Sequence, residues 1–432
     1  MNAQKPRQIA VHALLEHAKG SDYIEDILDR HLAKENSKPK DRALSQELTY
    51  GVIRWKLTLD WFIARKTRRR PPRLAQILLR LGLYQLLMLD RVPDHAAVHE
   101  TVEIAKELGL RVEAGFVNAI LRAFAREKAA ARLTLAQLQE REPALGFSHP
   151  QWLVNRWLKQ WSAPDVIKLL RWDNTPPPTY ARVNTLRTTP ADLQEHWLKE
   201  EVVAQACPLD WVGTELIFRL RSHPPIFDLR TFSEGDFYIQ DPSTLLAVTI
   251  LNPCSGETIL DLCAAPGGKT TFIAQLMQNR GRIFAEDWQP ERLSLIRENC
   301  RRLGVNCVCT ELSATMQAAA NSSLFDRILV DAPCSNTGVL RRRVDLRWRL
   351  RMEEIERLCR SQDDLLSAAS RRLKPGGTLV YSTCSLEPDE NRAVAQRFLA
   401  AHADFRLDLE RDLVPFRDEV DGAYVAKFVR TS

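Results

Sequence analysis

The chain has 432 residues, of which 45% are hydrophobic and 27% are charged, and its formal net charge at pH 7 is only +6. This composition is typical of globular proteins, and the length predicts two or three domains. No apolar run approaches the ~18 residues of a membrane span, and the polar N-terminus lacks the apolar core of a signal peptide. We therefore expect a cytoplasmic protein without a membrane segment.

Nine cysteines are scattered along the chain. Their number is odd, no C-x-x-C motif occurs, and the closest pair is Cys307 and Cys309. This pattern argues against a disulfide framework and against a zinc site, so we expect no metal. In a reducing compartment a free cysteine is usually a small buried hydrophobic residue, and any special role needs a separate argument.

Residues 1–140 are predicted to form an all-α bundle. Apolar residues recur at helical spacing in two stretches, at Leu74, Ile77, Leu78 and Leu81 and at Val98, Val102, Ala105 and Leu108. Extended alternation is absent, and Gly51, Gly82 and Gly115 are the only clear interruptions after Gly20.

Residues 141–235 are predicted to form a small α+β insert. A tryptophan-rich helix follows a linker that contains proline and glycine. The stretch "NTPPPTYARVNTLRTTP" then interrupts helical structure, because proline lacks the N–H donor that a helix needs. The alternation in "TYARVNTL" favours a strand, and "ADLQEHWLKEE" returns to helix.

Residues 236–432 are predicted to form a parallel α/β domain. Helices alternate with the apolar strands "ETILDLC", "RIFAED", "NCVCT", "DRILVDA" and "GTLVYST". Nearly continuous apolar runs indicate strands that are buried on both faces of a sheet. The alternating segment "GAYVAKFV" near the end is expected to contribute to an antiparallel hairpin at the edge of this sheet.

The loop after the first of these strands, "LDLCAAPGGKTT", ends in Gly268, Lys269 and Thr270 like a phosphate-binding loop. The first glycine of the G-x-x-x-x-G-K-[ST] motif would fall at Cys263, however, so the backbone cannot wrap a triphosphate. The sequence therefore disfavours an NTPase, although "ILVDAP" resembles the acidic strand that holds magnesium in such enzymes.

An alternative ligand for this loop is a nucleoside. Asp287 ends the next strand about twenty residues after Gly267, at a position where a carboxylate can accept hydrogen bonds from ribose hydroxyls. The G-x-G-x-x-G motif of a dinucleotide fold is absent. The loop therefore favours adenosine without a pyrophosphate, as in S-adenosylmethionine. An ordinary tight turn would have the same pattern.

Two later strands each end near a cysteine. Asp331 and Cys334 follow one strand in "ILVDAPCSNTG", and Cys384 follows the next in "LVYSTCSLEPDEN". Because the carboxyl ends of parallel strands lie on one rim of the sheet, where open α/β folds bind ligands, we expect both thiols at one site.

Arginine is concentrated in two segments. "RRRVDLRWRLR", from Arg341 to Arg351, combines six arginines with one acid and Trp348, and "RKTRRRPPR", from Arg65 to Arg73, is a second basic segment. A charge run is normally a solvated face, but arginines interleaved with an aromatic residue also suit phosphates and unstacked bases. The first segment directly follows the Cys334 turn, which favours contact with nucleic acid there, while a solvated face stays the alternative.

The motifs "DLCAAPGGKTT", "LVDAPCSNTGV" and "YSTCSLEPDEN" together resemble the Sun/Fmu family of RNA cytosine-5 methyltransferases. "LRLGLYQLLMLDRVPDHAAVHETVEIAK" and "FVNAILR" resemble that family's N-terminal NusB-like helical domain. The resemblance covers nearly the full chain in the same order. It implies an all-α NusB-like RNA-binding domain at 1–140, a small α+β RNA-binding insert at 141–235, and a Rossmann-like α/β methyltransferase domain at 236–432.

The resemblance also implies the reaction. We expect methylation of C5 of a cytosine in small-subunit (16S) ribosomal RNA, with S-adenosylmethionine as methyl donor and the protein acting as a monomer. Cys384 would be the nucleophile, Cys334 would help to release the product, and Asp331 would contact the cofactor or the base. The implied cofactor residues are Cys263, Ala264, Ala265, Pro266, Gly267, Gly268, Lys269, Asp287 and Asp331.

The chain departs from the family pattern at a few positions. Ser313 stands where an acid near the adenine is usual, Arg343 and Val344 replace a usual His-Pro, and Asn336 replaces a smaller residue. We expect these differences to affect affinity and RNA contacts more than chemistry.

The chemistry explains why two cysteines are useful. A thiolate that adds to C6 of cytosine breaks the aromaticity of the ring and makes C5 nucleophilic enough to take a methyl group. Lys269 or a nearby arginine could favour the thiolate. The C5 hydrogen must then leave before the sulfur can, and Cys334 could assist that step. Asp331 could bind the N3 and N4 edge of the base.

Three other functions stay open on the sequence alone. A DNA cytosine-5 methyltransferase would take its nucleophile from the Pro-Cys turn, hence from Cys334. A non-catalytic RNA-binding or assembly factor could have retained the methyltransferase fold, and a cytosine-5 methyltransferase could act on another RNA. The presence of both cysteines, Asp331 and Lys269 favours an active enzyme.

Overall fold

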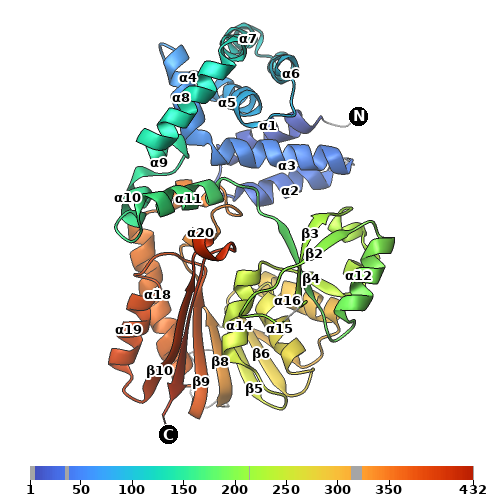
Figure 1. Ribbon diagram of the computed structural model, residues 1–432, viewed down its shortest axis with the longest axis vertical. Coiled ribbons are helices and arrows are strands. Elements are labelled where there is room, and N and C mark those ends of the chain that lie inside the picture. Colours follow the sequence, from blue (N-terminus) through green and yellow to red (C-terminus); the bar gives the residue numbers. More distant parts are fainter. Residues whose placement is uncertain (1–4, 35–37, 214, 313–323, 432) are drawn as a thin grey trace. The chain divides into compact units, whose positions relative to one another are not determined.

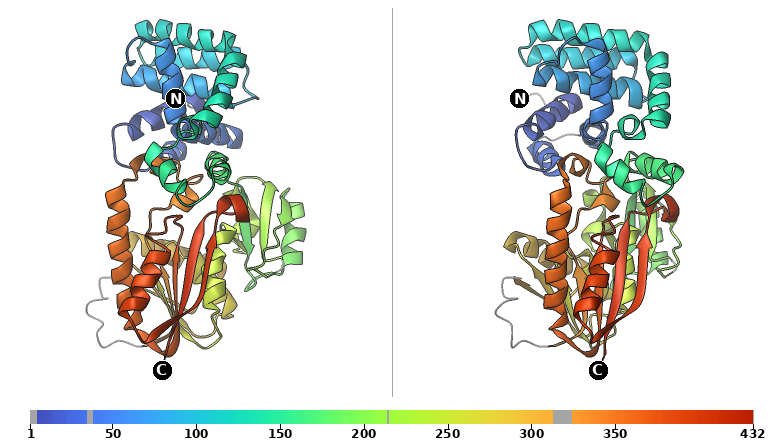
Figure 2. Two further views of the ribbon diagram at one scale, coloured as in Figure 1. Left: turned by 60° about the vertical axis from the view of Figure 1, so that its left-hand side comes forward. Right: turned by 90° about the vertical axis from the view of Figure 1, so that its left-hand side faces the viewer.

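The computed structural model describes residues 5–34, 38–213, 215–312 and 324–431. Two compact units divide the chain. The first contains Met1–Pro176 and Leu340–Arg349, and the second contains Pro177–Val339 and Leu350–Ser432. The ribbon in Figures 1 and 2 follows the chain through both units, which are described separately below.

The first unit is all-α, as the sequence predicts. Its helices are α1 (Pro6–His17), α2 (Ile24–Lys34), α3 (Pro39–Arg54), α4 (Lys56–Lys66), α5 (Arg73–Met88), α6 (Asp94–Glu107), α7 (Arg111–Arg126), α8 (Lys128–Arg141), α9 (Pro143–Gly146), α10 (Gln151–Trp157), α11 (Ala163–Asp173) and α17 (Leu346–Arg349). The periodic residues Ile77, Leu78 and Leu81 are buried, and so are Val98 and Val102. The helical spacing therefore identified the core-facing sides of α5 and α6.

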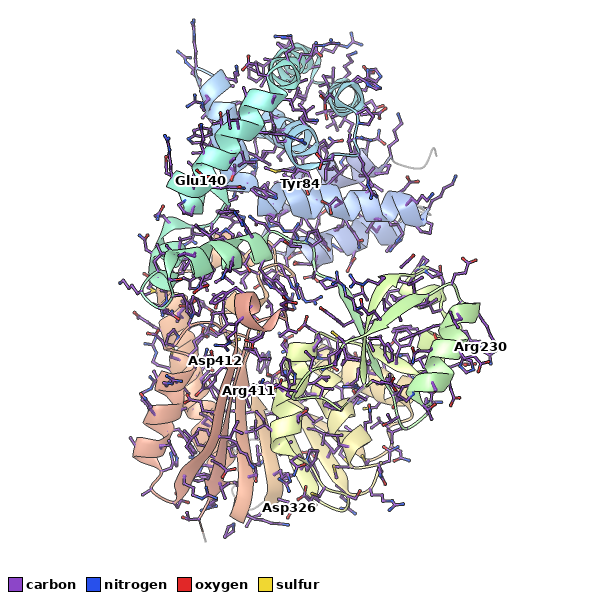
Figure 3. All side chains as sticks on the ribbon, in the orientation of Figure 1. Tyr84, Glu140, Arg230, Asp326, Arg411 and Asp412 are labelled. Atoms are coloured by element: carbon purple, nitrogen blue, oxygen red, sulfur yellow. The ribbon has the colours of Figure 1, made fainter. Side chains whose placement is uncertain are left out.

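The three glycines that looked like helix interruptions, Gly51, Gly82 and Gly115, all lie inside helices instead. Gly51 is in α3, where a Cβ atom would lie 1.9 Å from Cζ of Tyr84, a side chain labelled in Figure 3. Gly82 is in α5, where a Cβ atom would lie 2.4 Å from Cδ1 of Leu121. At Gly51 and Gly82 the absence of a side chain lets neighbouring helices approach closely, and this benefit outweighs the low helix propensity of glycine.

The helical unit extends past residue 140, the predicted boundary. Helices α9 to α11 belong to it, and so does the distant segment Leu340–Arg349. Val344 of that segment is buried in the hydrophobic core of the helical unit. Within the same segment, the carboxylate of Asp345 accepts hydrogen bonds from Ile24 N (3.1 Å) and from the ring of His17 (3.2 Å).

Two arginines of this segment, Arg341 and Arg347, do not lie on a solvated or phosphate-binding face, and the prediction for these two is therefore wrong. Arg347 is fully buried and donates to Asn174 Oδ1 (2.8 Å), to Asp173 O (3.0 Å) and to Ser148 O (3.3 Å). Arg341 is also buried, 3.9 Å above the ring centroid of Trp172. Arg343 is exposed. A charge run gives no sign of such long-range partners.

Arg347→Ala is therefore expected to destabilise the helical unit rather than to weaken RNA binding directly. The change removes a guanidinium and leaves two buried backbone carbonyls and the partly buried Asn174 amide oxygen without their donor, which should cost about 3 kcal/mol of unfolding free energy. Urea unfolding followed by tryptophan fluorescence measures this loss. Arg343→Ala is the matched control, and its expected effect is within about 0.5 kcal/mol because the side chain is exposed. Equal stability of the two variants would contradict the assignment.

The second unit begins with a small antiparallel sheet. Its elements are β1 (Thr179–Val183), α12 (Pro190–Lys199), β2 (Val203–Ala206), β3 (Ile217–Ser222), η1 (Ile226–Asp228), α13 (Arg230–Ser233) and β4 (Phe237–Ile239). The strand order is β2-β3-β1-β4. This arrangement confirms the predicted α+β character of the insert.

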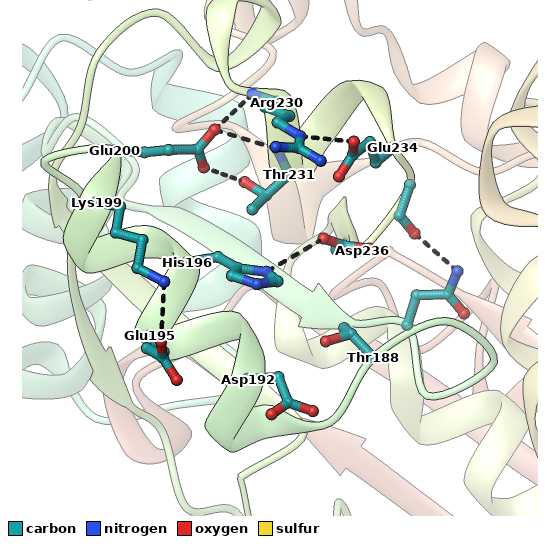
Figure 4. A network of polar contacts seen from close by, with 12 residues as sticks. Thr188, Asp192, Glu195, His196, Lys199, Glu200, Arg230, Thr231, Glu234 and Asp236 are labelled. Carbon is teal, nitrogen blue, oxygen red and sulfur yellow. Dashed lines mark hydrogen bonds and ion pairs between the residues drawn. The ribbon is translucent and has the colours of Figure 1, made fainter.

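Polar contacts join α12 and α13 on this small sheet (Figure 4). Glu200, at the end of α12, accepts from the backbone N–H of Arg230 (2.5 Å) and from the hydroxyl of Thr231 (2.5 Å). Arg230 in turn pairs with Glu234 at 2.6 Å. Glu200 thus satisfies two free N–H groups at the start of α13, those of Arg230 and Thr231. RNA binding by the insert stays a prediction.

The second unit continues with a large sheet. Its elements are η2 (Pro242–Thr244), α14 (Leu245–Leu251), β5 (Thr258–Leu262), α15 (Gly268–Leu276), β6 (Arg282–Asp287), α16 (Pro290–Leu303), β7 (Val308–Leu312), β8 (Phe325–Asp331), η4 (Thr337–Val339), α18 (Met352–Ser370), β9 (Leu373–Thr383), α19 (Arg392–Ala401), β10 (Phe405–Leu413), α20 (Pro415–Asp418) and β11 (Ala423–Arg430). The order is β10-β11-β9-β8-β5-β6-β7. Strands β9, β8, β5, β6 and β7 are parallel, whereas β10 and β11 form the predicted antiparallel hairpin.

Successive residues of the central strands alternate between two hydrophobic layers. Ile259 and Leu329 pack on the side of α14, α15 and α16, whereas Leu260 and Ile328 pack on the side of α18 and α19. Helices therefore cover both faces of the sheet, as Figures 1 and 2 show. This layering explains the continuous apolar runs, and it leaves the ends of the strands as the places for polar side chains.

Candidate active site

The two cysteine turns meet at the carboxyl ends of β8 and β9. These neighbouring strands are parallel, with Asp331 paired to Ser382 at their ends. The Sγ atoms of Cys334 and Cys384 lie 3.3 Å apart. The expectation that adjacent parallel strands bring both thiols to one place is confirmed.

At the opposite end of these strands, Asp326 joins neighbouring strands to one another. Asp326, labelled in Figure 3, stands at the start of β8. Its carboxylate accepts from the backbone N–H of Thr258 (2.8 Å) and pairs with Lys374 at 2.6 Å. These contacts fix the starts of β5, β8 and β9.

Asn336 lies in the first turn and contacts the thiol of the second. Its backbone is left-handed, with φ +56°. The side-chain Nδ2 donates to Cys334 O (2.7 Å), and Oδ1 accepts from Cys384 Sγ at 2.9 Å. Asn336 therefore bridges the two cysteines, a contact that the sequence did not predict, while the expectation that this departure affects RNA contacts more than chemistry stays a prediction. An asparagine in a tight turn was the available sequence signal, since it tolerates left-handed backbone.

The two thiols have different surroundings. Cys334 is buried, and its pKa is raised well above the usual value by the hydrogen bond with Cys384 and by burial. Cys384 is only partly buried, so it is the more accessible thiol. A thiol that keeps its proton suits proton transfer, whereas an accessible thiol suits attack.

Lys269 and Asp331 form an ion pair at the same rim, with Nζ 2.6 Å from Oδ2. Burial on its own would lower the pKa of Lys269, but the charges of Asp331 and Cys384 outweigh it and the net pKa is raised. Lys269 therefore stays charged near the thiols. The hydroxyl of Ser382 donates to Asp331 Oδ1 (2.8 Å), so both oxygens of this carboxylate are held.

The glycine-containing loop connects β5 to α15. Cys263 and Gly267 have left-handed backbone, with φ +61° and +100°. Ala264 N donates to Glu286 O (3.0 Å), and Ala265 N donates to Asp287 Oδ2 (3.1 Å). Pro266, Gly268 and Lys269 complete the turn and open α15, whose first N–H groups lie at the rim. The loop is therefore a tight turn whose backbone can approach a ligand closely.

Two acids end β6, and they differ in their partners. Asp287 is buried, accepts a hydrogen bond from the backbone N–H of Ala265, and forms an ion pair with Arg292 at 3.1 Å. Glu286 is held by Arg372 through two hydrogen bonds of 2.7 and 3.1 Å. Both acids are therefore buried and ion-paired, but only the carboxylate of Asp287 also accepts a hydrogen bond from the glycine-containing loop.

Asp261, inside β5, has an unpaired oxygen. The residue is fully buried, and burial raises its pKa to about 7. Thr270 Oγ1 donates to Oδ2 at 2.6 Å, while Oδ1 has no partner among the described residues. A buried carboxylate with a free oxygen is costly unless a ligand supplies a donor or a cation. This observation fits a bound cationic group, and no sequence motif assigned Asp261 a role.

Arg182 is a second residue without a predicted role. It projects from β1 of the small sheet and is buried, which lowers its pKa to about 9. Its guanidinium donates to Gly268 O (2.8 Å), to Thr271 Oγ1 (3.0 Å) and to Gln240 Oε1 (2.7 Å). The small sheet thus supports the start of α15. The only sequence signal was a charged residue inside an otherwise apolar strand.

The remaining expectations concern features outside this rim. Ser313 lies outside the described residues. Among the described residues, no group of three or more His, Cys, Asp or Glu could hold a metal ion. All nine cysteines are free thiols. Of the helices in the described ranges, none is long and apolar enough to cross a membrane.

Comparisons with known proteins agree with this architecture. The family model described as 16S rRNA methyltransferase RsmB/F matches residues 248–429, the NusB family model matches 4–126, and a model described as a Methyltr_RsmF/B-like, ferredoxin-like domain matches 149–215. The first unit is thus NusB-like in its N-terminal part, and the large sheet belongs to a Rossmann-like methyltransferase domain.

Individual proteins extend the match over most of the chain. The probable ribosomal RNA small subunit methyltransferase B of Bacillus subtilis is 35% identical over 95% of this chain and 91% of its own length. The crystal structure of PH0851 superimposes over 99% of both chains with TM-score 0.80 at 23% identity, which shows the fold alone. A methyltransferase homolog protein from Pyrococcus horikoshii has TM-score 0.58 and 33% identity over 66% of this chain and 97% of its own. On these matches and this fold, the chain belongs to the RsmB/F family of 16S rRNA methyltransferases.

Proposed function

We propose that the protein methylates C5 of a cytosine in small-subunit (16S) ribosomal RNA through a covalent adduct between Cys384 and C6 of the base. The observation that carries this proposal is the pair of thiols 3.3 Å apart at the rim, beside the Lys269–Asp331 ion pair. The names of the relatives support ribosomal RNA as the substrate. The contrast between an accessible and a buried thiol supports cysteine chemistry on a base.

S-adenosylmethionine is the proposed methyl donor, because it supplies a methyl group on an electrophilic sulfonium. The loop from Cys263 to Gly268 would hold it against its backbone, and Asp287 would accept hydrogen bonds from the ribose hydroxyls. The unpaired Oδ1 of Asp261 would accept a donor from the ligand's ammonium group. Lys269 and Asp331 stand between this loop and the thiols.

The attack step uses Cys384 as the nucleophile. Its thiol gives up its proton to solvent, a loss that the positive charge of Lys269 would favour, and Sγ forms a bond to C6 of cytosine. The electron pair of the C5–C6 double bond shifts toward C5 and makes it nucleophilic, so that C5 would take the methyl group and S-adenosylhomocysteine would leave. Asp331 would bind the N3 and N4 edge of the base, where charge develops.

The release step uses Cys334. After methyl transfer C5 carries both a methyl group and a hydrogen. A base or water takes the proton from C5, the electron pair of that C–H bond restores the C5–C6 double bond, and the sulfur of Cys384 leaves as a thiolate. Cys334 lies next to Cys384 and is placed to assist this elimination, directly by giving its thiol proton to the departing sulfur or through water.

RNA contacts outside the rim are proposed for the other basic segment. Arg65, Arg68, Arg69, Arg70 and Arg73 are exposed around the connection between α4 and α5. Exposed arginines can bind phosphates, and each such contact should appear in the salt dependence of RNA binding. With Arg341 and Arg347 buried, this segment is the better candidate for the electrostatic contacts.

The product nucleoside tests the proposed function. The protein is incubated with methyl-labelled S-adenosylmethionine and 16S ribosomal RNA, both as naked RNA and as small-subunit particles, and the RNA is digested to nucleosides. We expect label in 5-methylcytidine with at least one of the two substrates, and none with DNA. Label in N4-methylcytidine or in another base would overturn C5 chemistry. No transfer to any substrate would favour a non-catalytic RNA-binding factor.

Asp287→Ala is expected to weaken binding of S-adenosylmethionine by about 1–3 kcal/mol, the range for leaving buried hydrogen-bonding groups unsatisfied. Titration calorimetry measures the change. Glu298→Ala, an exposed acid on the following helix α16, is the control and should bind like the unmodified protein. Unchanged affinity in a folded Asp287→Ala variant would show that the ribose contact lies elsewhere.

A further inference from the structure

One buried carboxylate touches both cysteine turns. Glu390 lies just before α19, and its side chain is fully buried. It accepts hydrogen bonds from Ser335, the residue after Cys334, and from Ser385, the residue after Cys384. These two serines come from turns that follow different strands, so Glu390 connects the ends of β8 and β9 beyond the last rung of the sheet.

The contacts of Glu390 use both of its oxygens. Oε1 accepts from Ser335 N (2.8 Å) and from Gln362 Nε2 (3.0 Å), and Oε2 accepts from Ser385 Oγ (2.6 Å) and from Ser335 Oγ. Gln362 of α18 also donates to Pro333 O (2.9 Å), so it fixes the first turn on the side before Cys334. The backbone carbonyl of Glu390 accepts from Tyr381 OH (2.6 Å).

The cost of this arrangement suggests that it serves a purpose. Burial raises the pKa of Glu390, while hydrogen bonds from Ser335 and Ser385 oppose that shift. No lysine, arginine or histidine of the described residues forms a salt bridge with it. A buried carboxylate without a cation is tolerated only when donors satisfy it, and such groups contribute more to a unique geometry than to stability.

We propose that Glu390 is a positioning residue for the reaction, which holds the two cysteine turns at the spacing that lets both thiols act on one base. Other contacts also join the two turns, among them the bond from Cys384 Sγ to Asn336, the bond from Gly338 N to Cys384 O (2.9 Å) and the bond from Leu386 N to Thr337 Oγ1 (2.9 Å). Glu390 is the one charged group among these contacts, and it holds both serines that follow the cysteines. The inference of a role in catalysis rests on the proposed function, whereas the inference about geometry does not.

A trivalent arsenical measures the thiol geometry independently of methyl transfer. Phenylarsine oxide condenses with two nearby thiols, forming two arsenic–sulfur bonds and releasing one water, and it requires both sulfurs to be close. We expect one equivalent to bridge Cys334 and Cys384 in the unmodified protein, located by peptide mass spectrometry. Cys384→Ala identifies signal from the other cysteines and should abolish this bridge.

Glu390→Ala should lower the affinity of phenylarsine oxide for the thiol pair at least about tenfold, and it should lower kcat by a similar factor. The reason is that a charge-assisted hydrogen bond contributes roughly a factor of ten or more. Affinity for S-adenosylmethionine should stay unchanged, since Glu390 does not contact the glycine-containing loop. Asp389→Ala changes the exposed neighbour in the same turn and should behave like the unmodified protein. A folded Glu390→Ala variant with normal bridging and normal kcat would overturn the proposal.

Glu390→Gln covers the case in which the alanine variant does not fold. Glutamine keeps the shape and one acceptor oxygen but replaces the other oxygen with a donor, so we expect an intermediate loss, at least about threefold in bridging. Bridging equal to that of Asp389→Ala would overturn the proposal. Normal bridging in the unmodified protein without methyl transfer to any substrate would instead contradict the proposed function and leave the geometric role of Glu390 intact.

Discussion

Cys384→Ala is expected to abolish methyl transfer while leaving binding of S-adenosylmethionine intact. Without the thiol no bond forms at C6, C5 stays part of an aromatic ring, and the rate should fall by roughly a thousandfold or more, equivalent to about 4 kcal/mol of transition-state stabilisation. The cofactor affinity should not change, because Cys384 follows β9 and the glycine-containing loop follows β5.

Transfer of labelled methyl groups under single-turnover conditions measures this effect, with calorimetry for the cofactor. Cys359→Ala is a suitable control, because that cysteine is also partly buried but lies on α18. Robust turnover by Cys384→Ala would refute its assignment as the nucleophile. Loss of cofactor affinity in parallel would indicate a general disruption of the domain.

Cys334→Ala is expected to have a different effect, namely accumulation of a covalent protein–RNA complex. Attack by Cys384 should proceed, but the C5 proton has lost the group that assists its removal. Proton transfer of this kind typically contributes 10²–10⁴-fold, so overall turnover should slow by about that factor. The complex should require S-adenosylmethionine and survive denaturing electrophoresis.

The choice of RNA sharpens this experiment. The target base must leave its stack to reach both thiols, at a cost of a few kcal/mol. A loop or bulge RNA should therefore form the complex better than a duplex. The Cys334→Ala, Cys384→Ala double variant should form none. If Cys384→Ala accumulates the complex and Cys334→Ala does not, the roles are reversed and the protein resembles the DNA enzymes in its nucleophile.

The residues at the rim of the site could be predicted from the sequence, because their positions depend on local patterns. Apolar runs mark strands buried on both faces, and parallel neighbours must end on one edge. Asp331, Cys334 and Cys384 follow such runs directly, so their meeting followed from the topology. The loop after β5 was predictable for the same reason. Gly267 adopts the left-handed φ of +100° that glycine favours, and Asp287 ends the next strand.

The residues that support the rim were not predictable in this way. Glu390 and Arg182 act through hydrogen bonds to turns far away in the sequence, and no periodic pattern identifies such partners. The prediction for the arginine-rich segment failed at Arg341 and Arg347 for the same reason. Arg347 looked like a surface charge, but its partners are carbonyl groups and an amide near α11 that only the fold brings to it.

Identification of the amino acid that carries the RNA tests the central claim most directly. The complex formed by Cys334→Ala with S-adenosylmethionine and a 16S ribosomal RNA fragment would be digested with nuclease and protease and analysed by tandem mass spectrometry. The mechanism proposed here predicts a methylated cytidine nucleotide attached to the peptide that contains Cys384. A nucleotide attached to any other residue, or no attached nucleotide from a variant that still binds the RNA and the cofactor, would contradict it.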